Sequence, residues 1–503
     1  MTDHLLNPSQ QAAVESDAPS LLIVAGPGAG KTHTLTCRIL HQINKLNNSQ
    51  KILAITFTRK AAGEMRARLS PHISSLDEKI FVGTFHQWCM DILRQDSGQD
   101  IAVADDNQCL SIAQQVWPDL SASDCKKRLE EISRYKSCCF DRDEPEVVLH
   151  YNRALRERRF YDFDDLLLET WRLLKNRPDV LSAVKGVYPE IFVDEYQDIN
   201  AIQQELLKIL AGPDNHLTAI GDPDQAIYGF RGSDVRFFYA FMDVFPGAQM
   251  LSLNENYRNA QDVLAAASQM MSPGRSPDVP AQAARIHAQG RLTIHAASTD
   301  RSEAEYIVHT IEQLVGGTSI FSQDSGRVDS HHDGELSFGD IAVLYRLKRQ
   351  AVELKKAFER SGMPFHVVGD TAADQEIEAD LFSQRHAEPD VDSEKVTLMT
   401  LHASKGLEFG CVFICGCEEG LLPLSLMKMT ADRDEERRLL YVGMTRARHR
   451  LYLIHAARRR LYGLRLSNPP SPFLADIEES LKNHSRTAFK KKESKDDGQM
   501  TLF

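Results

Sequence analysis

The sequence lacks a long apolar run and has few cysteines. No stretch approaches the roughly 18 consecutive apolar residues of a membrane-spanning helix, and the start, MTDHLLNPSQ, shows no basic and then apolar signal pattern. The nine cysteines have no repeated CxxC spacing, which argues against a disulfide framework. Three of them, Cys411, Cys415 and Cys417, lie in an apolar run, where a free cysteine packs as a small hydrophobic residue. We therefore expect a cytoplasmic protein without a membrane contact.

An excess of positive charge is also missing. The chain has 59 lysine and arginine residues against 71 aspartate and glutamate residues, a formal net charge of −12. This balance argues against a protein that holds nucleic acid by general positive charge, but it leaves room for a local groove. With 503 residues the chain exceeds what one hydrophobic core usually supports, so several domains are expected.

The clearest positive signal is the stretch Leu21–Thr36, LLIVAGPGAGKTHTLT. Four apolar residues predict a short buried strand, a glycine-rich turn follows, and Lys31 and Thr32 open a helical stretch. Glycines let backbone N–H groups surround a phosphate, the lysine adds a positive charge for the β- and γ-phosphates, and the threonine hydroxyl suits Mg²⁺. A glycine-rich turn that ends in Lys-Thr by chance would not need the strand and the helix around it. The predicted phosphate loop comprises Ala25, Gly26, Pro27, Gly28, Ala29, Gly30, Lys31 and Thr32, with alanine at the first position where glycine is usual.

Acidic and amide side chains follow two further apolar strands. The stretch Glu190–Asn200, EIFVDEYQDIN, ends its apolar run in Asp194 and Glu195, and Leu217–Gly232 continues into an Asp-Pro-Asp-Gln run that ends at Gln225. Beside a phosphate loop, one carboxylate can hold Mg²⁺ and its neighbour can orient or deprotonate a water. Two adjacent acids also occur by chance in an acidic protein, but here they end a buried strand. The amide of Gln225 suits a γ-phosphate sensor.

The residue composition and the predicted secondary structure change along the chain. Residues 95–159 are mainly polar helical stretches, which indicate an inserted helical subdomain, and Asp162, Asp164 and Asp165 at the start of the next helix indicate capping rather than metal binding. Residues 272–290 are rich in proline, glycine and alanine and predict a connection to a second alternating pattern of strands and helices. Residues 316–335 predict a solvated loop, with two histidines that are not expected to bind metal. The aromatic residues that follow Gln225 suit base stacking.

The ordered motifs resemble those of superfamily 1 DNA helicases of the UvrD/Rep/PcrA type. They run from Leu6 to Leu474 and read LNPSQ, AGPGAGKT, TFTRKAAGEM, VGTFH, DEYQD, GDPDQAIYGFRG, NYRN, TLHASKGLEF and RRLLYVGMTRAR. The resemblance implies an α/β fold of two tandem RecA-like P-loop domains, with a compact helical insertion, similar to the family's 1B subdomain, in the first. It also implies ATP and Mg²⁺ as cofactors and 3′-to-5′ movement along single-stranded DNA.

The resemblance also implies domain boundaries. The first RecA-like domain (1A) is expected at residues 1–94 and 160–250, with the 1B-like insertion at 95–159. The second (2A) is expected at 251–382 and 394–475, and a flexible tail at 476–503. The family's large 2B insertion is expected to be absent, because the stretch ending at Phe382 reaches Val396 through a short polar connector. No nuclease motif is recognisable.

The family's functional residues map onto matching positions of this sequence. For the nucleotide, the resemblance implies that Gln10 reads adenine, Tyr257 stacks on it and Glu408 contacts the ribose; an ordinary surface glutamine is the alternative for Gln10. Lys31 and Thr32 would hold phosphate and Mg²⁺, Asp194 would share the metal, Glu195 would be the base, and Gln225 would sense the γ-phosphate. Arg258 and Arg446 resemble arginine fingers that reach across from the second domain. The implied DNA contacts are Phe57, His86, Tyr228, Phe230, which stands where the family often has tryptophan, and His402 in the coupling strand.

The first interpretation is a DNA-stimulated ATPase and 3′-to-5′ helicase of DNA repair or replication, with single-stranded and 3′-tailed duplex DNA as partners. A translocase that strips proteins from DNA without robust unwinding, or an ATP-gated DNA-binding or clamp-docking scaffold, are the alternatives. The last residues, QMTLF, resemble the peptide by which bacterial repair and replication proteins dock on the sliding clamp. Gln499, Leu502 and Phe503 are therefore predicted to bind the clamp, a frayed end being the alternative.

Overall fold

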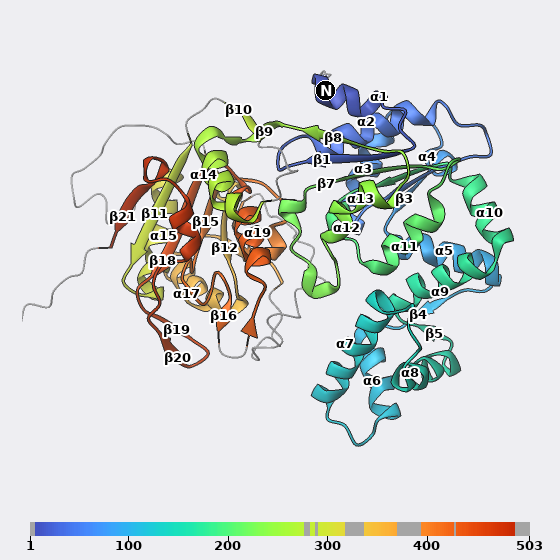
Figure 1. Cartoon of the computed structure of the whole chain (residues 1–503). Coiled ribbons are helices and arrows are strands. Elements are labelled where there is room, and N and C mark those ends of the chain that lie inside the picture. Colours follow the sequence, from blue (N-terminus) through green and yellow to red (C-terminus); the bar gives the residue numbers. More distant parts are fainter. Residues whose placement is uncertain are drawn as a thin grey trace, which may run out of the picture. The chain divides into compact units, whose positions relative to one another are not determined.

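A computed structural model of the chain describes residues 6–275, 282–286, 290–316, 336–369, 394–426 and 429–487. The chain forms two compact units, the first of residues 1–258 and 275–286 and the second of residues 259–274 and 287–503 (Figure 1). Among the described residues, no helix is long and apolar enough to cross a membrane.

The first unit is built around a six-stranded sheet of order β3-β2-β6-β7-β1-β8, in which all pairings are parallel. Its inner strands are buried on both faces and therefore read as continuous apolar runs. Because parallel strands point the same way, the loops after their carboxyl ends meet at one edge of the sheet. The strands are β1 (Ser20–Ala25), β2 (Ile52–Ile55), β3 (Ile80–Gly83), β6 (Glu190–Val193), β7 (His216–Gly221) and β8 (Ala248–Leu253).

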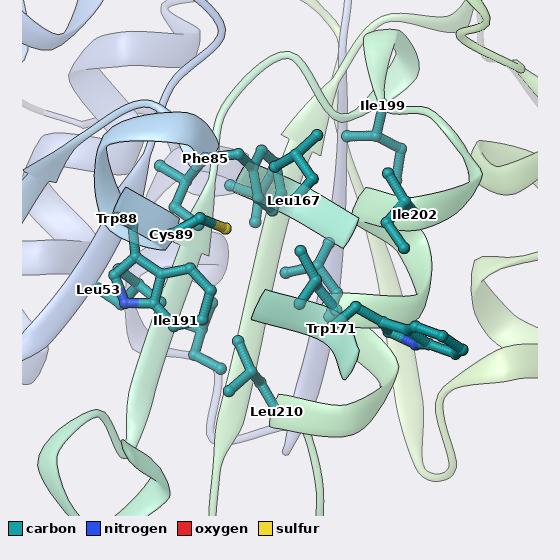
Figure 2. Close-up of a cluster of buried hydrophobic side chains, with 14 of the residues drawn as sticks. Leu53, Phe85, Trp88, Cys89, Leu167, Trp171, Ile191, Ile199, Ile202 and Leu210 are labelled. Carbon is teal, nitrogen blue, oxygen red and sulfur yellow. The ribbon is translucent and has the colours of Figure 1, made fainter. Parts of the chain in front are cut away.

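Helices cover both faces of this sheet. Successive side chains of β1 point to opposite faces, so Leu21 packs in one buried cluster and Leu22 in another. Figure 2 shows part of the second cluster, where Trp88 and Leu167 are buried between helices and strands. The first face carries α1 (Pro8–Glu15), α2 (Lys31–Ile43) and α3 (Arg59–Leu69), and the second carries α5 (Phe85–Ser97), α9 (Phe163–Asn176), α10 (Pro178–Val187) and α11 (Ala201–Leu210).

Three helices of the first unit form a small lobe with its own core: α6 (Asp106–Val116), α7 (Ala122–Cys138) and α8 (Glu146–Glu157) (Figure 1). A short parallel pair, β4 (Ala102–Val103) with β5 (Phe160–Tyr161), closes its base. The buried Lys136 on α7 forms ion pairs with Asp162 at 2.6 Å and Asp165 at 2.7 Å. These two acids also form the capping box of α9, so the prediction of a capping role is confirmed.

The second unit contains a seven-stranded parallel sheet of order β13-β14-β12-β15-β18-β11-β21. Cys411 and Cys415 pack in its buried cluster as small hydrophobic residues, as predicted. The strands are β11 (Arg291–Ala297), β12 (Ile341–Tyr345), β13 (Phe365–Val367), β14 (Val396–Thr400), β15 (Phe409–Ile414), β18 (Ala447–Ala456) and β21 (Asn483–Arg486). The helices are α14 (Gln261–Met271), α15 (Asp300–Leu314), α17 (Ala351–Ser361) and α19 (Arg433–Met444). The prediction of an α/β fold with two parallel sheets is therefore confirmed.

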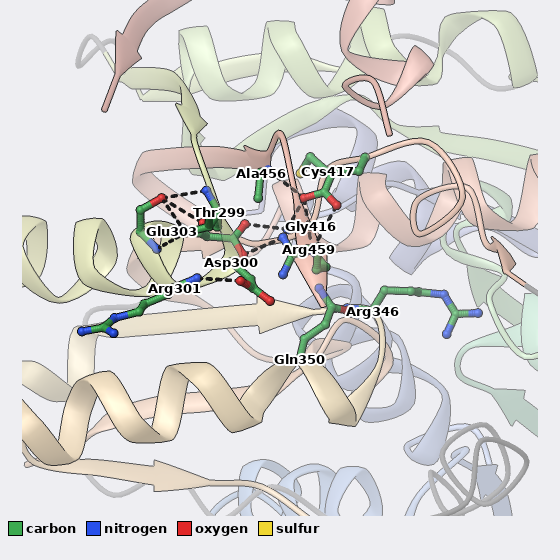
Figure 3. Close-up of polar contacts among 12 residues, drawn as sticks. Thr299, Asp300, Arg301, Glu303, Arg346, Gln350, Gly416, Cys417, Ala456 and Arg459 are labelled. Atoms are coloured by element: carbon green, nitrogen blue, oxygen red, sulfur yellow. Dashed lines mark hydrogen bonds and ion pairs between the residues drawn. The ribbon is translucent and has the colours of Figure 1, made fainter. Parts of the chain in front are cut away.

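A buried arginine joins several elements of the second unit (Figure 3). Arg459 donates to Glu303 of α15 and to Glu418, at 2.6 Å in each case. Glu303 in turn accepts from the backbone N–H of Gly416 at 2.9 Å. Burial and the nearby Glu418 raise the pKa of Glu303, which Arg459 opposes. Because each buried charge has a partner, the network holds α15 against the loop after β15.

The remaining short elements connect these layers. They are α4 (Leu76–Lys79), α12 (Arg236–Tyr239), α13 (Phe241–Val244), the pair β9 (Glu255–Ala260) and β10 (Ala283–Ile286), the hairpin β16 (Ser425–Leu426) and β17 (Met429–Thr430), and the hairpin β19 (Arg459–Leu461) and β20 (Leu464–Leu466).

Two boundaries differ from the expectation. Strand β8 pairs with β1, and the first unit runs to Arg258, so residues 251–258 pack with the first unit, whereas the second domain was expected to begin at residue 251. Residues 476–487, expected in the flexible tail, include β21, which pairs with β11. The sequence of β21 is polar and shows no strand pattern. Backbone pairing with β11, which needs no apolar side chains, holds it at the sheet edge. The remaining tail residues 488–503, the connector after Phe382, and His331 and His332 lie outside the described residues.

Candidate nucleotide and DNA site

The phosphate loop connects β1 to α2. Gly28 and Gly30 have φ of +67° and +80°, in the left-handed region that glycine adopts without strain. A Cβ on Gly28 would lie 2.6 Å from the Cβ of Arg258, so this position also requires glycine for space. No side chain caps the first N–H groups of α2. The loop and the helix start therefore present backbone donors, which suits a phosphate.

Lys31 lies among the predicted catalytic acids. Its Nζ donates to the carbonyl oxygens of Ala25 at 2.8 Å and Gly26 at 3.1 Å. Burial lowers the pKa of Lys31, while the charges of Glu195, Asp222 and Asp194 oppose this shift and that of Arg258 adds to it. The structure thus brings together a lysine, an arginine and three carboxylates that are far apart in the sequence.

The acidic pair follows β6 at the carboxyl edge of the first sheet. The Asp194 N–H donates to the carbonyl of Ile55 on β2 at 2.9 Å, and the Glu195 N–H donates to Asp194 Oδ1 at 3.0 Å. Glu195 has φ of +53°, which is uncommon for a residue with a side chain and often marks functional positions. After β7, the buried Gln225 donates to Asp222 Oδ2 at 2.5 Å.

The residues predicted to hold adenine also lie near the loop. The Gln10 side chain accepts from Asn7 N–H at 3.0 Å and donates to the carbonyl of Ala29 at 3.1 Å. Asn7 Nδ2 donates to the hydroxyl of Tyr257 at 2.9 Å, and Tyr257 N–H donates to the carbonyl of Gly28 at 2.9 Å. Tyr257 is 47% exposed. The Tyr257 ring lies near the start of α1 and is therefore exposed for stacking on a base.

Magnesium fits the oxygen donors at this edge. Among the described residues, no group of three or more His, Cys, Asp or Glu side chains is arranged to hold a metal by itself. Mg²⁺ is often bound through one or two carboxylates together with water and phosphate oxygens. The Asp194 carboxylate and the Thr32 hydroxyl match that chemistry, and they suit a metal that arrives with the nucleotide.

Three predicted site residues belong to the second unit. Arg446 is buried and donates to the carbonyls of Val442 at 2.9 Å and Leu407 at 3.1 Å. Glu408 is exposed and pairs with Arg448. His402 begins the single turn η8 (His402–Ser404) after β14, rather than lying in a strand, and is only 6% exposed, which leaves it little surface for a nucleotide.

Arg258 differs from its predicted placement. The sequence assigned it to the second domain, as a finger reaching across, but it belongs to the first unit. It packs against Gly28 of the phosphate loop. Asn256 Nδ2 donates to the carbonyl of Pro27 at 2.7 Å, and this contact holds the start of the NYRN motif on the loop, two residues before Arg258.

The structure brings three of the predicted DNA-binding aromatics together. The rings of Phe57 and Tyr228 stack with centroids 5.1 Å apart, and Phe230 meets Tyr228 edge-on at 6.1 Å. The Arg231 guanidinium lies 5.1 Å from the Tyr228 ring centroid. Phe230 is 43% exposed. These residues form an aromatic surface beside the carboxyl edge of the first sheet.

His86 has a different partner, one that the sequence did not suggest. Its ring meets Phe163 edge-on at 5.6 Å, and Phe163, the first residue of α9, is 47% exposed. The signal in the sequence was an aromatic residue at a helix start, outside the apolar stripe of the helix. Burial lowers the pKa of His86 to about 4, so at neutral pH it offers an uncharged ring.

Comparison with known proteins identifies the family. Residues 6–246 match the UvrD/REP helicase N-terminal domain, and residues 251–377 and 375–458 match the UvrD-like helicase C-terminal domain. The chain is 28% identical to ATP-dependent DNA helicase PcrA of Leuconostoc citreum over 654 aligned positions, which cover 95% of this chain and 85% of the relative. PcrA of Bacillus subtilis (strain 168) is 26% identical, with 95% and 86% covered, and PcrA of Staphylococcus aureus (strain MRSA252) is 28% identical, with 95% and 87% covered. The chain therefore belongs to the UvrD/REP helicase family.

Proposed function

We propose that this chain is an ATP-dependent 3′-to-5′ DNA helicase and single-stranded DNA translocase. The observation that carries the proposal is the carboxyl edge of the first sheet, where the phosphate loop, the acidic pair, the amide of Gln225 and the aromatic surface lie on neighbouring loops. Because the proposed substrates are single-stranded and 3′-tailed duplex DNA, we place the protein in the cytoplasm and in DNA repair or replication.

The proposed roles in hydrolysis combine the chemistry and position of the residues with what the family resemblance implies. Lys31 and the loop N–H groups bind the β- and γ-phosphates, and Thr32 and Asp194 hold Mg²⁺, which when bound supplies positive charge to the phosphate oxygens. Glu195 orients and deprotonates the attacking water. Further residues assigned to ATP are Gln10 and Tyr257 at the adenine, Glu408 at the ribose, Gln225 at the γ-phosphate, and Arg258 and Arg446 at the developing charge.

DNA binding follows from the aromatic surface. Phe57, Tyr228 and Phe230 stack on bases without regard to sequence, and each stack contributes about 1–3 kcal/mol. Such binding needs no net positive charge on the whole protein, which matches the formal charge of −12. His86 and Phe163 form a second aromatic pair, after β3, which is proposed to contact DNA as well, while the buried His402 acts through its neighbours.

The absence of a 2B insertion is part of the proposal. The alignment with Leuconostoc citreum PcrA exceeds the 503 residues of this chain, so the relative has residues without a counterpart here. The two matches to the C-terminal domain also meet at residues 375–377, near the expected position of the missing insertion. This shorter second domain favours one alternative, a translocase that displaces proteins without robust unwinding.

The decisive experiment combines hydrolysis with unwinding. ATPase activity is measured with and without single-stranded DNA, and unwinding on 3′-tailed and 5′-tailed duplexes. We expect DNA-stimulated hydrolysis and unwinding of the 3′-tailed duplex only. Lys31→Ala removes the phosphate charge and abolishes hydrolysis, whereas Glu195→Gln binds ATP without turnover. Near wild-type turnover by Glu195→Gln would refute the assignment of the base, and strand separation only from 5′ tails would refute the polarity.

A further inference from the structure

The side chain of Gln197 connects the ends of two neighbouring strands. It lies in the single turn η1 (Tyr196–Asp198) after β6 and is fully buried. Its Nε2 donates to Oε2 of Glu195, and its Oε1 accepts from the backbone N–H of Asp222 at 2.9 Å. A single amide therefore bridges the proposed base after β6 and the first acid after β7.

The space for this amide is provided by a glycine. A Cβ on Gly221, the last residue of β7, would lie 2.3 Å from Oε1 of Gln197. Any other residue at this position would push the amide away from the Asp222 N–H. On the other side, Glu195 has a left-handed backbone conformation. The bridge thus depends on Gly221, where only glycine leaves space for the amide. It also depends on the left-handed backbone of Glu195, which residues with a side chain seldom adopt.

The hydrogen bonds continue from Asp222 toward the aromatic surface. Its Oδ1 accepts from Asp224 N–H at 3.1 Å, and its Oδ2 accepts from Gln225 Nε2 at 2.5 Å. Tyr228 lies three residues beyond Gln225 in the same loop. A continuous set of hydrogen bonds within the first unit therefore joins the proposed base to the proposed γ-phosphate sensor, and the same loop then carries the first of the proposed DNA-binding aromatics.

We propose that Gln197 is a positioning residue, which holds the Glu195 carboxylate in its productive orientation and links it to the DNA-binding loop. The inference rests on the proposed function, because the orientation of the Glu195 carboxylate matters for catalysis only if Glu195 is the base. A flexible carboxylate must be held within a fraction of an ångström for efficient proton abstraction. DNA that moves the loop after β7 changes this orientation through Asp222 and Gln197.

An amide is the group that this position requires. It donates to a carboxylate and accepts from a backbone N–H at the same time, from one planar group. A leucine would leave the N–H of Asp222 buried without an acceptor, and a glutamate would place a second carboxylate against Glu195. Neither replacement reproduces both contacts.

The test is steady-state ATPase kinetics of Gln197→Leu across a range of ATP and single-stranded DNA concentrations. We expect the DNA-stimulated kcat to fall about 10- to 100-fold, as for a misplaced catalytic group, with less than threefold change in the KM for ATP. The ratio of rates with and without DNA should fall toward one. Gln197→Glu keeps an acceptor for Asp222 but loses the donor to Glu195, and it should lose kcat in the same way even if the leucine variant does not fold.

Gln204→Leu is the matched control. Gln204 is equally a buried glutamine and accepts from the hydroxyl of Tyr196 at 2.7 Å, but it belongs to α11. It should lower thermal stability without changing the ratio of rates with and without DNA. A wild-type kcat and DNA stimulation in both Gln197 variants, or an equal loss of stimulation in Gln204→Leu, would overturn the inference.

The two proposals fail in different ways. If the wild-type protein shows no DNA-stimulated hydrolysis, the proposed function fails and this inference with it. If the wild-type protein is active and Glu195→Gln is inactive, but Gln197→Leu behaves as wild type, only the role of Gln197 is refuted.

Discussion

Phe230 exposes a large apolar ring at the carboxyl edge of the first sheet. Its neighbour Tyr228 supports it from one side, and the Arg231 guanidinium lies 5.6 Å from the Phe230 ring centroid. An exposed aromatic beside a cation gains stabilisation when a base covers it, because both the ring face and the guanidinium plane stack on bases. The ring therefore suits a site that single-stranded DNA occupies transiently.

We predict that Phe230→Ala weakens binding of single-stranded DNA by about 1–3 kcal/mol, because one base loses its stacking partner. Phe230→Trp should strengthen binding, since the larger ring covers more of the base. Fluorescence anisotropy with a labelled oligonucleotide measures both. Tyr239→Ala removes a similarly exposed ring of the first unit, on α12, and is the control. Unchanged affinity in Phe230→Ala would show that the ring has a packing role only.

His295 predicts a pH dependence of stability. Burial, followed by the charge of His455, lowers its pKa to about 4, and its ring nitrogens lie 2.8 Å from Ser485 Oγ and 2.9 Å from Thr487 Oγ1. The unfolded value is about 6.5. Between these values the unfolded chain binds more protons, so the stabilisation is fully present above about pH 6.5 and is lost as the pH falls toward 4.

His295→Gln should therefore reduce the loss of unfolding free energy between pH 7 and pH 5, because an amide does not titrate in this range. Urea denaturation at both pH values measures the difference. The exposed His72, changed to glutamine, serves as the control. An equal loss in wild type and His295→Gln would contradict the prediction.

Local motifs were predictable at the residue scale, whereas cross-strand contacts were not. The phosphate loop could be located because its chemistry depends on adjacent residues, and the structure places Lys31 among the expected acids. Gln197 and Phe163 were missed because their significance depends on partners from other elements. No sequence spacing shows that Gln197 meets the backbone N–H of Asp222, since the fold creates that contact.

At the scale of elements, β9 is anchored at both ends by buried asparagines. Asn256 donates to the phosphate loop, and Asn259 Nδ2 donates to the carbonyls of Thr445 at 3.0 Å and Ala447 at 2.6 Å. The chain passes from the first unit to the second between Arg258 and Asn259. In the second unit, the two carbonyls that accept from Asn259 flank Arg446 in the sequence.

Lys136 provides a buried polar link between the small lobe and α9, beside the ion pairs that Arg156 of α8 makes with α9. Its side chain is fully buried, as is that of Asp165. We predict that Lys136→Met destabilises the protein by about 3–5 kcal/mol, because it leaves Asp162 without its cation and Asp165 with Arg156 alone. Urea denaturation followed by circular dichroism measures the change.

The exposed Lys126 lies on the same helix and is the matched control. Lys126→Met should change the unfolding free energy by less than about 0.5 kcal/mol. Combining Lys136→Met with Asp162→Asn should recover part of the lost unfolding free energy, since Asp162 is the carboxylate that loses its ion pair. A cost below 1 kcal/mol for Lys136→Met would show that the lobe packs independently of this ion pair.

Helices and buried strands of this chain were predictable from periodicity, because their apolar patterns are local. The ion pairs of Lys136 were not, since its partners lie on another helix. Strand β21 was missed for a similar reason. Its residues are polar, and it is held by backbone pairing with β11 and by hydroxyl contacts to His295, which leave no hydrophobic signal.

At the scale of the whole molecule, the proposed absence of a 2B insertion predicts how the protein moves on DNA. Such an insertion can impose self-restraint on a helicase, so a chain without one should translocate as a monomer, with its duplex contacts supplied by the compact 1B-like lobe or by a partner. Single-turnover unwinding over a concentration series tests this, because a monomer gives amplitudes and rates that do not depend on protein concentration once all DNA is bound. A requirement for two protomers per DNA end would contradict it.

The last prediction concerns the C-terminal residues, which lie outside the described structure. A hydrophilic stretch, Lys490–Gly498, precedes the terminal QMTLF. Two large apolar side chains after such a leader gain stabilisation only when a partner buries them, by about 1.5–3 kcal/mol each, less the cost of ordering the tail. This range supports a weak and reversible contact, and it matches the clamp-binding peptide that the sequence resembles.

We therefore predict that the tail binds the bacterial sliding clamp and raises the local concentration of the helicase at sites of repair or replication. Leu502→Ala combined with Phe503→Ala should abolish retention on immobilised clamp and leave DNA-stimulated ATPase unchanged, because the tail has no part in hydrolysis. Lys490→Ala with Lys491→Ala changes the leader alone and should retain binding. Equal retention of the intact protein and the Leu502 and Phe503 double variant would refute the clamp contact, since the two apolar side chains supply its stabilisation.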